Sequence, residues 1–148
     1  MKELEVKFVK LSKRACVPKY ATEGAAGADL FACLDAPMTL SPRERALVPT
    51  GLKVGLPENT AGFVFARSGL AHRKGLSLSN GVGVIDCDYT GELKVAVVNL
   101  SDTAVTVEDG ERIAQLVVAP VYRVEFKETD TLEKTKRGSG GFGSTGTK

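Results

Sequence analysis

Apolar residues recur at every second position in short runs along this chain, and this alternation constrains its fold more than any other feature. The runs are Leu4, Val6 and Phe8, then Leu52, Val54 and Leu56, then Leu93, Val95 and Val97, and finally Val105 and Val107. A period of two residues places successive apolar side chains on one face of a β-strand. The pattern therefore predicts a chain built mostly of strands that each bury one face.

Turn-forming residues separate these runs at short intervals. They are Ser41-Pro42, Pro49-Thr50-Gly51, Pro57-Glu58-Asn59, Asn80-Gly81, Thr90-Gly91, Asp109-Gly110 and Ala119-Pro120. Many short strands joined by such turns are typical of antiparallel sandwiches and barrels. We predict an all-β domain over residues 1–127.

One segment fits a short helix instead, near Ser68 to Lys74. Ser68 could cap this helix, Leu70 and Ala71 could face inward, and Gly75 would end it.

After Phe126 the alternation stops, and the remainder, KETDTLEKTKRGSGGFGSTGTK, is polar and then rich in glycine. It has too little apolar surface to pack as core, so we predict a flexible C-terminal arm over residues 128–148. Its glycines match G-x-G-x-x-G, but no strand precedes them and no helix can follow, which argues against a dinucleotide site. The arm is either a plain flexible tail or a clasp that holds a nucleotide through Arg137, Phe142, Ser144 and Thr145.

Composition narrows the possible partners. The 148 residues suit one domain, and 43% apolar with 26% charged residues is the balance of a soluble globular protein. A net charge of +2 is too small to indicate a nucleic-acid partner. No apolar run reaches the roughly 20 residues that a membrane helix needs, and the start MKELEVKFVKL lacks the apolar core of a secretory signal. We expect a cytoplasmic protein with no membrane partner, whose three widely spaced cysteines are reduced thiols.

The segment SNGVGVIDCDYTGE, residues 79–92, combines turn signals with an acidic pair. Asn80-Gly81 favours a tight hairpin turn. Gly83 either leaves one face of that hairpin bare for a planar ligand or marks a β-bulge. Asp86 and Asp88 are either solvated turn residues or include a base that activates water, and Tyr89 is equally ambiguous.

The stretch ARSGLAHRKG places Arg67 and Ser68 where a strand would meet a helix, an arrangement suited to binding phosphate. His72 could pair with Ser68 as base and nucleophile, but the G-x-S-x-G elbow is absent and a surface position is the simpler interpretation. Gln115 is an amide in an apolar strand, so it needs a backbone or ligand partner if buried. Arg112 has the same two interpretations, or is simply an exposed strand residue.

Taken in order, five stretches resemble the motifs of the homotrimeric deoxyuridine triphosphatase (dUTPase) family. They are AAGADLFA at 25–32, ARSGLA at 66–71, NGVGVIDCDYTGE at 80–92, GERIAQLV at 110–117 and RGSGGFGSTG at 137–146. The resemblance covers nearly the whole chain. It implies a jelly-roll or distorted β-barrel subunit that assembles as a homotrimer, with each active site lined by different subunits.

The resemblance also implies an activity, the hydrolysis of dUTP to dUMP and pyrophosphate. This reaction keeps uracil out of DNA and supplies dUMP for thymidylate synthesis. By position, Asp86 is the general base that deprotonates the water attacking the α-phosphorus. The uracil edge is read by Asn80, Gly83, Val84, Ile85 and Lys94.

The remaining motif residues surround the sugar and the phosphates. Tyr89 lies against the deoxyribose and leaves no room for a 2′-hydroxyl. The phosphate chain is held by Arg67, Ser68, Gly69 and Gln115. In the arm, Phe142 stacks on uracil while Arg137, Ser144 and Thr145 reach the terminal phosphate.

The resemblance implies Mg²⁺ as cofactor, held by substrate phosphates and, through a water, by Asp29. Two other functions remain open. One is deamination of dCTP, the activity of a sibling family with the same fold, although the complete fifth motif favours the triphosphatase. The other is a nucleotide-dependent binding protein, against which an intact Asp86 argues.

Overall fold

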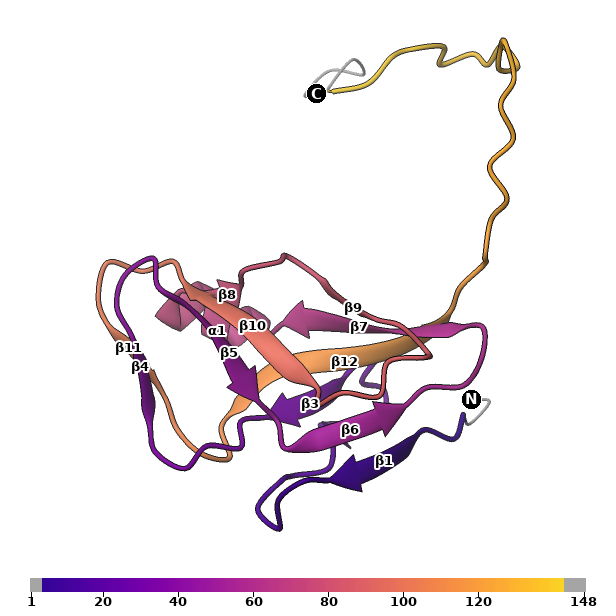
Figure 1. Cartoon of the computed structure of the whole chain (residues 1–148). Coiled ribbons are helices and arrows are strands. Elements are labelled where there is room, and N and C mark those ends of the chain that lie inside the picture. The colour runs from indigo at the N-terminus through magenta and orange to yellow at the C-terminus, as the bar shows by residue number, and fades with distance from the viewer. Residues whose placement is uncertain (1–3, 143–148) are drawn as a thin grey trace.

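The computed structural model of this protein describes residues 4–142 (Figure 1). Its elements are β1 (Lys7–Lys10), β2 (Lys19–Tyr20), β3 (Ala28–Phe31), β4 (Met38–Leu40), β5 (Arg45–Pro49), β6 (Leu52–Gly55), β7 (Thr60–Ala66), α1 (Ser68–Lys74), β8 (Leu76–Leu78), β9 (Gly83–Ile85), β10 (Lys94–Asn99), β11 (Val105–Val107) and β12 (Arg112–Pro120). The described chain is thus strands with one short helix, so the all-β prediction is confirmed.

The strands form antiparallel sheets that pack around one core. The largest sheet has the order β2-β3-β12-β7-β9, and the others are β5-β10-β8, β11-β4 and β1-β6. Leu30 and Leu116 of the largest sheet share one cluster of buried side chains with Val48 and Val95 of the β5-β10-β8 sheet. These two packed layers form the jelly-roll sandwich that the resemblance implies.

The alternation of apolar and polar residues in the sequence corresponds to an alternation of buried and exposed side chains in the strands. Leu52 and Val54 of β6 are buried while Lys53 between them is exposed, and β11 buries Val105 and Val107. The two-residue period of apolar residues predicted these strands correctly, because each of them faces the core on one side only.

The helix α1 has the predicted bounds, but Ser68 does not cap it. Arg67 is the N-cap residue and makes no side-chain capping hydrogen bond, and Ser68 is the first helical residue. The prediction for the other end is confirmed, since Gly75 ends the helix in the left-handed conformation with φ of 69°. Leu70 is buried against the core, and Ala71 is half-buried.

The turn at Asn80-Gly81 is present, but the predicted hairpin is wrong. Gly81 has the positive φ of 71° that such a turn requires. The strands on either side do not pair with each other, because β8 pairs with β10 and β9 pairs with β7. Residues 79–82 therefore carry the chain from one sheet to the other.

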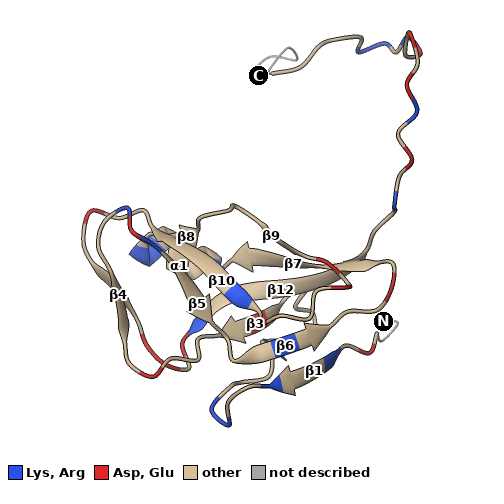
Figure 2. Cartoon of the chain, viewed as in Figure 1, with Lys and Arg blue, Asp and Glu red and all other residues tan. Residues whose placement is uncertain are grey.

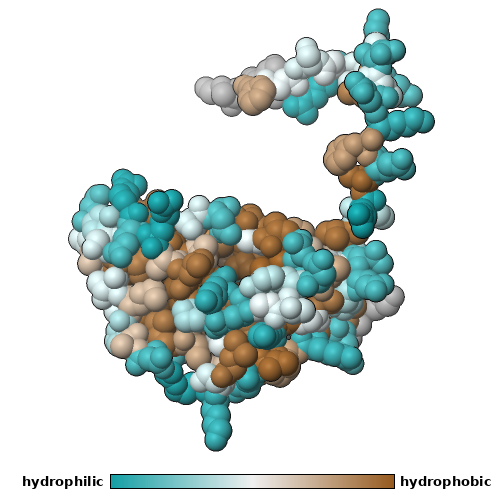
Figure 3. Space-filling model, viewed as in Figure 1, coloured by the Kyte–Doolittle hydropathy of each residue, from teal (hydrophilic) through white to brown (hydrophobic). Residues whose placement is uncertain are grey.

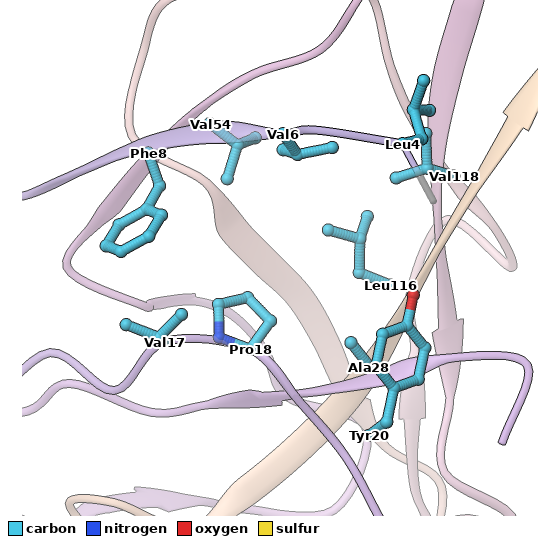
Figure 4. A pocket seen from close by; sticks show the side chains of 10 residues that line it. All are labelled: Leu4, Val6, Phe8, Val17, Pro18, Tyr20, Ala28, Val54, Leu116 and Val118. Atoms are coloured by element: carbon cyan, nitrogen blue, oxygen red, sulfur yellow. The ribbon is translucent and has the colours of Figure 1, made fainter. Parts of the chain in front are cut away.

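An apolar groove opens beside β1 (Figure 4). Its lining residues are Leu4, Val6, Phe8, Val17, Pro18, Tyr20, Ala28, Val54, Leu116 and Val118. Leu4, Phe8 and Tyr20 of this groove are exposed, whereas Val54 and Leu116 are buried. The space-filling view shows brown, apolar patches on the face that it presents (Figure 3).

The chain after β12 leaves the body of the molecule (Figure 1). Tyr122 and Phe126 are 96% and 93% exposed, and Val124 is also exposed. Both acidic and basic residues occur along the part that follows (Figure 2). No helix among residues 4–142 is both long enough and apolar enough to cross a membrane. All three cysteines are free, as predicted.

Candidate active site

Asp29, in β3, lies between two arginines from other elements. Its Oδ1 accepts a hydrogen bond from Arg67 Nε at 3.0 Å, and its Oδ2 accepts one from Arg112 Nη1 at 3.2 Å. Arg67 Nη1 also donates to the main-chain oxygen of Arg112 at 3.2 Å. We call Asp29, Arg67 and Arg112 the arginine cluster. With two cations and one anion, it carries a formal charge of +1 at the surface.

The arginine cluster differs from a surface ion pair because its carboxylate is buried. The Asp29 side chain is only 9% exposed, whereas those of Arg67 and Arg112 are 25% and 49% exposed. A buried carboxylate requires partners, which the two guanidinium groups supply. The cations then face solvent and are placed to meet an anion.

Gln115 and the start of α1 adjoin the cluster. Gln115 is the strand partner of Asp29 on one side and of Phe65 on the other. Its side chain is half-buried rather than fully buried, and its Oε1 lies 3.0 Å from where a Cβ would stand at Gly27. Ser68 and Gly69 follow Arg67 directly, so four of the residues predicted to hold phosphate, Arg67, Ser68, Gly69 and Gln115, lie in one region.

Asn80 and Gly83 form a second group, beside β7. Gly83 pairs with Val64, and a Cβ added at Gly83 would lie 3.1 Å from Val64 Cβ and 3.5 Å from Asn80 Nδ2. The pairing of β9 with β7 continues in regular register through Ile85 opposite Gly62, so the β-bulge interpretation of Gly83 is wrong. The glycine instead lets β9 approach Val64 and the Asn80 amide closely, next to the exposed Val84 and the half-buried Ile85.

Asp86 follows β9 at the surface and opens a turn in which the Tyr89 N–H donates to the Asp86 carbonyl at 3.1 Å. The Tyr89 hydroxyl donates to the Glu92 carbonyl at 2.9 Å, and its ring covers Gly91, where a Cβ would clash with that hydroxyl. The phenol is thereby held against its own loop, and the Asp86 carboxylate remains exposed.

Glu92 ties this loop to the body of the sandwich. Its Oε1 accepts a hydrogen bond from the Gly51 N–H at 3.0 Å, and its Oε2 lies 3.7 Å from Lys94 Nζ. Lys94 begins β10, so its ammonium lies at the base of the loop that carries Asp86. Glu92 has no role assigned from the sequence, because its partner Gly51 is distant in the chain.

The two groups stand apart within one chain. Because Ile85 pairs with Gly62, Asp86 lies near the start of β7, whereas Arg67 follows its end. Arg67 lies five positions after Gly62 in the extended chain, which is roughly 17 Å at about 3.3 Å per residue. The structure therefore brings part of the predicted phosphate residues together, from Arg67 to Gly69 with Gln115, and part of the predicted uracil residues together, Asn80 with Gly83 to Ile85. It does not bring Asp86 to Arg67.

The arm contributes two described residues. Arg137 Nε donates to the Gly140 carbonyl at 2.7 Å, which closes a small turn, and Phe142 is fully exposed. Neither contacts the two groups above in the single chain. Ser144 and Thr145 lie outside the described residues.

Metal-binding and nucleophilic chemistry have few candidate residues here. Among residues 4–142 no group of three or more His, Cys, Asp or Glu side chains is placed to hold a metal ion. His72 is exposed on α1, as predicted. The carboxylates of Asp29 and Asp86 are therefore the main candidates for acid–base chemistry and metal binding at the site.

This chain is similar to known proteins over nearly its whole length. The dUTPase family model matches residues 13–146. A deoxyuridine 5'-triphosphate nucleotidohydrolase of Desulfitobacterium hafniense is 52% identical over 145 residues, which cover 97% of this chain and 96% of that protein. One from Hydrogenobaculum sp. is 51% identical over 139 residues, covering 94% and 96%.

A solved structure also matches in three dimensions. The dUTPase of Staphylococcus bacteriophage 80alpha with dUPNHPP superposes with a TM-score of 0.87 at 29% identity, covering 96% of this chain and 98% of that one. Sequence and fold point the same way, and the resemblance seen in the five motifs is confirmed. The chain belongs to the dUTPase family, and it is an enzyme of that family.

Proposed function

We propose that this protein hydrolyses dUTP to dUMP and pyrophosphate by in-line attack of a water molecule on the α-phosphorus. The observation that carries the proposal is the exposed Asp86 carboxylate, which directly follows a strand whose Gly83 lies close to Asn80 with no side chain between them. A carboxylate so placed can take the proton of a water as that water attacks. The base and the recess for the pyrimidine then lie on one short segment.

The recess is suited to reading a pyrimidine edge. The Asn80 amide offers both a donor and an acceptor, and the missing side chain at Gly83 lets a planar base approach the backbone. Main-chain groups of Val84 and Ile85, and the ammonium of Lys94, complete the set we assign to uracil. Cytosine presents the opposite donor pattern and would leave these groups unpaired.

Tyr89 supplies selection at the sugar. Its hydroxyl is tied to the Glu92 carbonyl, so the ring cannot swing aside without losing that bond. A fixed ring against the deoxyribose leaves no space for a 2′-hydroxyl, and UTP is refused by shape.

The arginine cluster, with Ser68, Gly69 and Gln115, is suited to the phosphate chain. Its surplus positive charge and its planar guanidinium groups match phosphate oxygens. Held in a fixed geometry, such donors stabilise charge that develops on the phosphates during bond cleavage.

Mg²⁺ fits the residues present. This ion binds mainly to substrate phosphates and water, which suits a described chain with no three-carboxylate cage. Each Asp29 oxygen accepts one arginine and keeps a further acceptor site, so Asp29 would hold a metal-bound water. When bound, the ion supplies neutralisation of the phosphate charge.

We further propose a homotrimer whose active sites are shared between subunits. Asp86 and Arg67 lie at opposite ends of β7 in one chain, so one copy's recess must meet another copy's arginine cluster. The exposed alternation of Tyr122, Val124 and Phe126 is strand-like and has no partner in its own described chain. The apolar groove beside β1 would receive this segment from a second copy (Figure 4).

The arm, residues 128–148, would then close over the site. Phe142 would stack on the uracil face, and Arg137, Ser144 and Thr145 would reach the terminal phosphate. The full exposure of Phe142 in the single chain supports this assignment, because an aromatic ring gains most from a partner that covers it.

A pyrophosphate-release assay tests the activity over dUTP, dCTP, dTTP, dATP, dGTP and UTP. The proposal expects release from dUTP alone. Release from UTP at a comparable rate would contradict the role of Tyr89. Ammonia released from dCTP would indicate the deaminase instead, and no turnover of any nucleotide would overturn the proposed function.

A further inference from the structure

The cluster of Asp29, Arg67 and Arg112 depends on an irregularity in β12. Gln115 pairs with Asp29 and Ala114 with Leu30, but the next partner, Phe31, is met by Arg112 instead of Ile113. Ile113 is thus an extra residue in β12, and it is buried in the core with Ala114. This is the pattern of a β-bulge.

The bulge decides where Arg112 points. In a regular strand, side chains at 112 and 114 share one face, and Ala114 faces the core. The inserted residue moves Arg112 to the opposite face, the one that carries Asp29 and Gln115. Without the bulge the arginine would lie on the core side and could not meet Asp29 Oδ2.

The contacts hold Arg67 on two sides. Its Nε donates to Asp29 and its Nη1 to the Arg112 carbonyl, while Nη2 makes no hydrogen bond with any residue among 4–142. Arg112 occupies the second Asp29 oxygen. Each arginine therefore takes one oxygen, and neither forms the two-pronged pair that guanidinium groups frequently make with carboxylates.

We propose that Asp29 and Arg112 are positioning residues that fix the orientation of the Arg67 guanidinium toward the phosphate chain. With Arg112 in place, Arg67 engages Asp29 through Nε alone and presents Nη2 to the ligand. Without Arg112, both Asp29 oxygens become available to Arg67, which turns to pair with them and withdraws Nη2. This inference rests on the proposed function of Arg67 as a phosphate ligand.

A double-mutant cycle measures whether Arg112 acts through Arg67. The variants are Arg67→Ala, Arg112→Met and both together, assayed as kcat/KM for dUTP with Mg²⁺. We expect Arg112→Met to lower kcat/KM about tenfold, within the range found for residues of one network. The double variant should match Arg67→Ala alone within about twofold, because no guanidinium is left to misplace. If the loss of kcat/KM in the double variant equals the product of the two single losses, the proposal is overturned.

Conservative and matched variants separate positioning from general damage. Arg112→Lys restores a cation to Asp29 Oδ2 and should recover part of the loss. Lys74→Met is the control, since the Lys74 side chain is also 49% exposed and ion-paired, but to Glu111 at 2.9 Å. Kinetics for Lys74→Met should equal those of the wild type. An Arg112→Lys variant no better than Arg112→Met would count against orientation of Arg67 through Asp29.

Binding without metal separates this role from metal binding. In EDTA, titration calorimetry with dUDP as probe should show at least tenfold weaker binding to Asp29→Asn, while deoxyuridine, which lacks phosphate, binds as to the wild type. Thermal unfolding confirms that the variant is folded, and Arg112→Met serves in its place if it is not. If Asp29→Asn weakens dUDP binding only when Mg²⁺ is present, Asp29 acts through the metal and the proposal fails.

The outcomes distinguish this inference from the proposed function. A wild-type protein that releases no pyrophosphate from dUTP would contradict the function itself. If the wild type is active but the losses of kcat/KM from Arg67→Ala and Arg112→Met multiply in the double variant, only the positioning role is contradicted.

Discussion

Asp86 and Arg67 lie at opposite ends of β7, because Ile85 pairs with Gly62 and the chain continues from there away from Arg67. In a single chain, the candidate base and the candidate phosphate ligand are separated by most of that strand. The distance disappears when two copies meet with the start of one β7 near the end of the other. Symmetric oligomers create such shared sites at every interface.

Mixed subunits should therefore recover activity that neither parent has. Asp86→Asn lacks the base and Arg67→Ala lacks a phosphate ligand, so each should be nearly inactive alone. When the two are unfolded together and refolded at equal amounts, about one quarter of the interfaces combine both intact groups at random. Pyrophosphate release from dUTP measures the recovery.

The control is the same mixture without unfolding, where subunits have not exchanged and activity should stay low. If the refolded mixture is no more active than its parts, the base and the arginine belong to one chain and the shared site is excluded.

Removal of the base should affect chemistry rather than binding. Asp86→Asn keeps the size of the side chain but cannot take a proton, so kcat should fall by roughly 10²–10⁴-fold. The affinity for a non-hydrolysable dUTP analogue should be nearly unchanged, because the carboxylate acts on water. Single-turnover kinetics and calorimetry measure the two quantities. A variant with normal kcat would exclude Asp86 from the mechanism.

Local sequence signals predicted what depends on local structure. The alternation located β6, β10 and β11, and the residues Ser68 to Lys74 gave the bounds of α1. Gly75 ends the helix because glycine adopts the left-handed conformation, here with φ of 69°, without steric cost. These features need no information about distant strands.

Features set by pairing between distant strands could not be predicted. The segment at Asn80-Gly81 looks like a hairpin turn, yet its flanking strands join different sheets. The bulge that turns Arg112 toward Asp29 exists only relative to the register of β3. The motif residues were named from the family resemblance, but their division into two separated groups required the structure.

The absence of a side chain at Gly83 should be needed for binding of the uracil ring. A Cβ at Gly83 would stand 3.1 Å from Val64 Cβ, which cannot give way easily, and 3.5 Å from Asn80 Nδ2. We expect Gly83→Ala to weaken dUMP binding about tenfold, the effect of one methyl group in a close-fitting pocket. Overpacking should also lower stability by about 1–3 kcal/mol.

Gly55→Ala is the matched control, since it lies in a strand and its Cβ would meet Lys7 at an ordinary 3.8 Å. Calorimetry with dUMP and chemical unfolding should find this variant close to the wild type. Equal losses in the two variants would mean that Gly83 serves the strand and not the ligand.

The segment after β12 should hold the trimer together. Phe126 is 93% exposed in the single chain and would fill the groove of a second copy. Phe126→Ser should shift the protein from trimer toward monomer in sedimentation equilibrium as the concentration falls. Leu132→Ser is the control, since Leu132 is 89% exposed but lies in the arm beyond this segment. A trimer equally stable in both variants would contradict the assignment of the groove.

The arm should be required for turnover and not for folding. Within residues 128–142 nearly all side chains are exposed, so deletion of residues 137–148 removes no core. We expect the truncated protein to unfold at the same temperature and to remain a trimer. Its kcat/KM for dUTP should fall by at least about 100-fold, since closure adds donors to the phosphates and excludes water. Phe142→Ala in the full chain should lose only the stacking contribution, and a truncated enzyme with full activity would show that the arm is merely a tail.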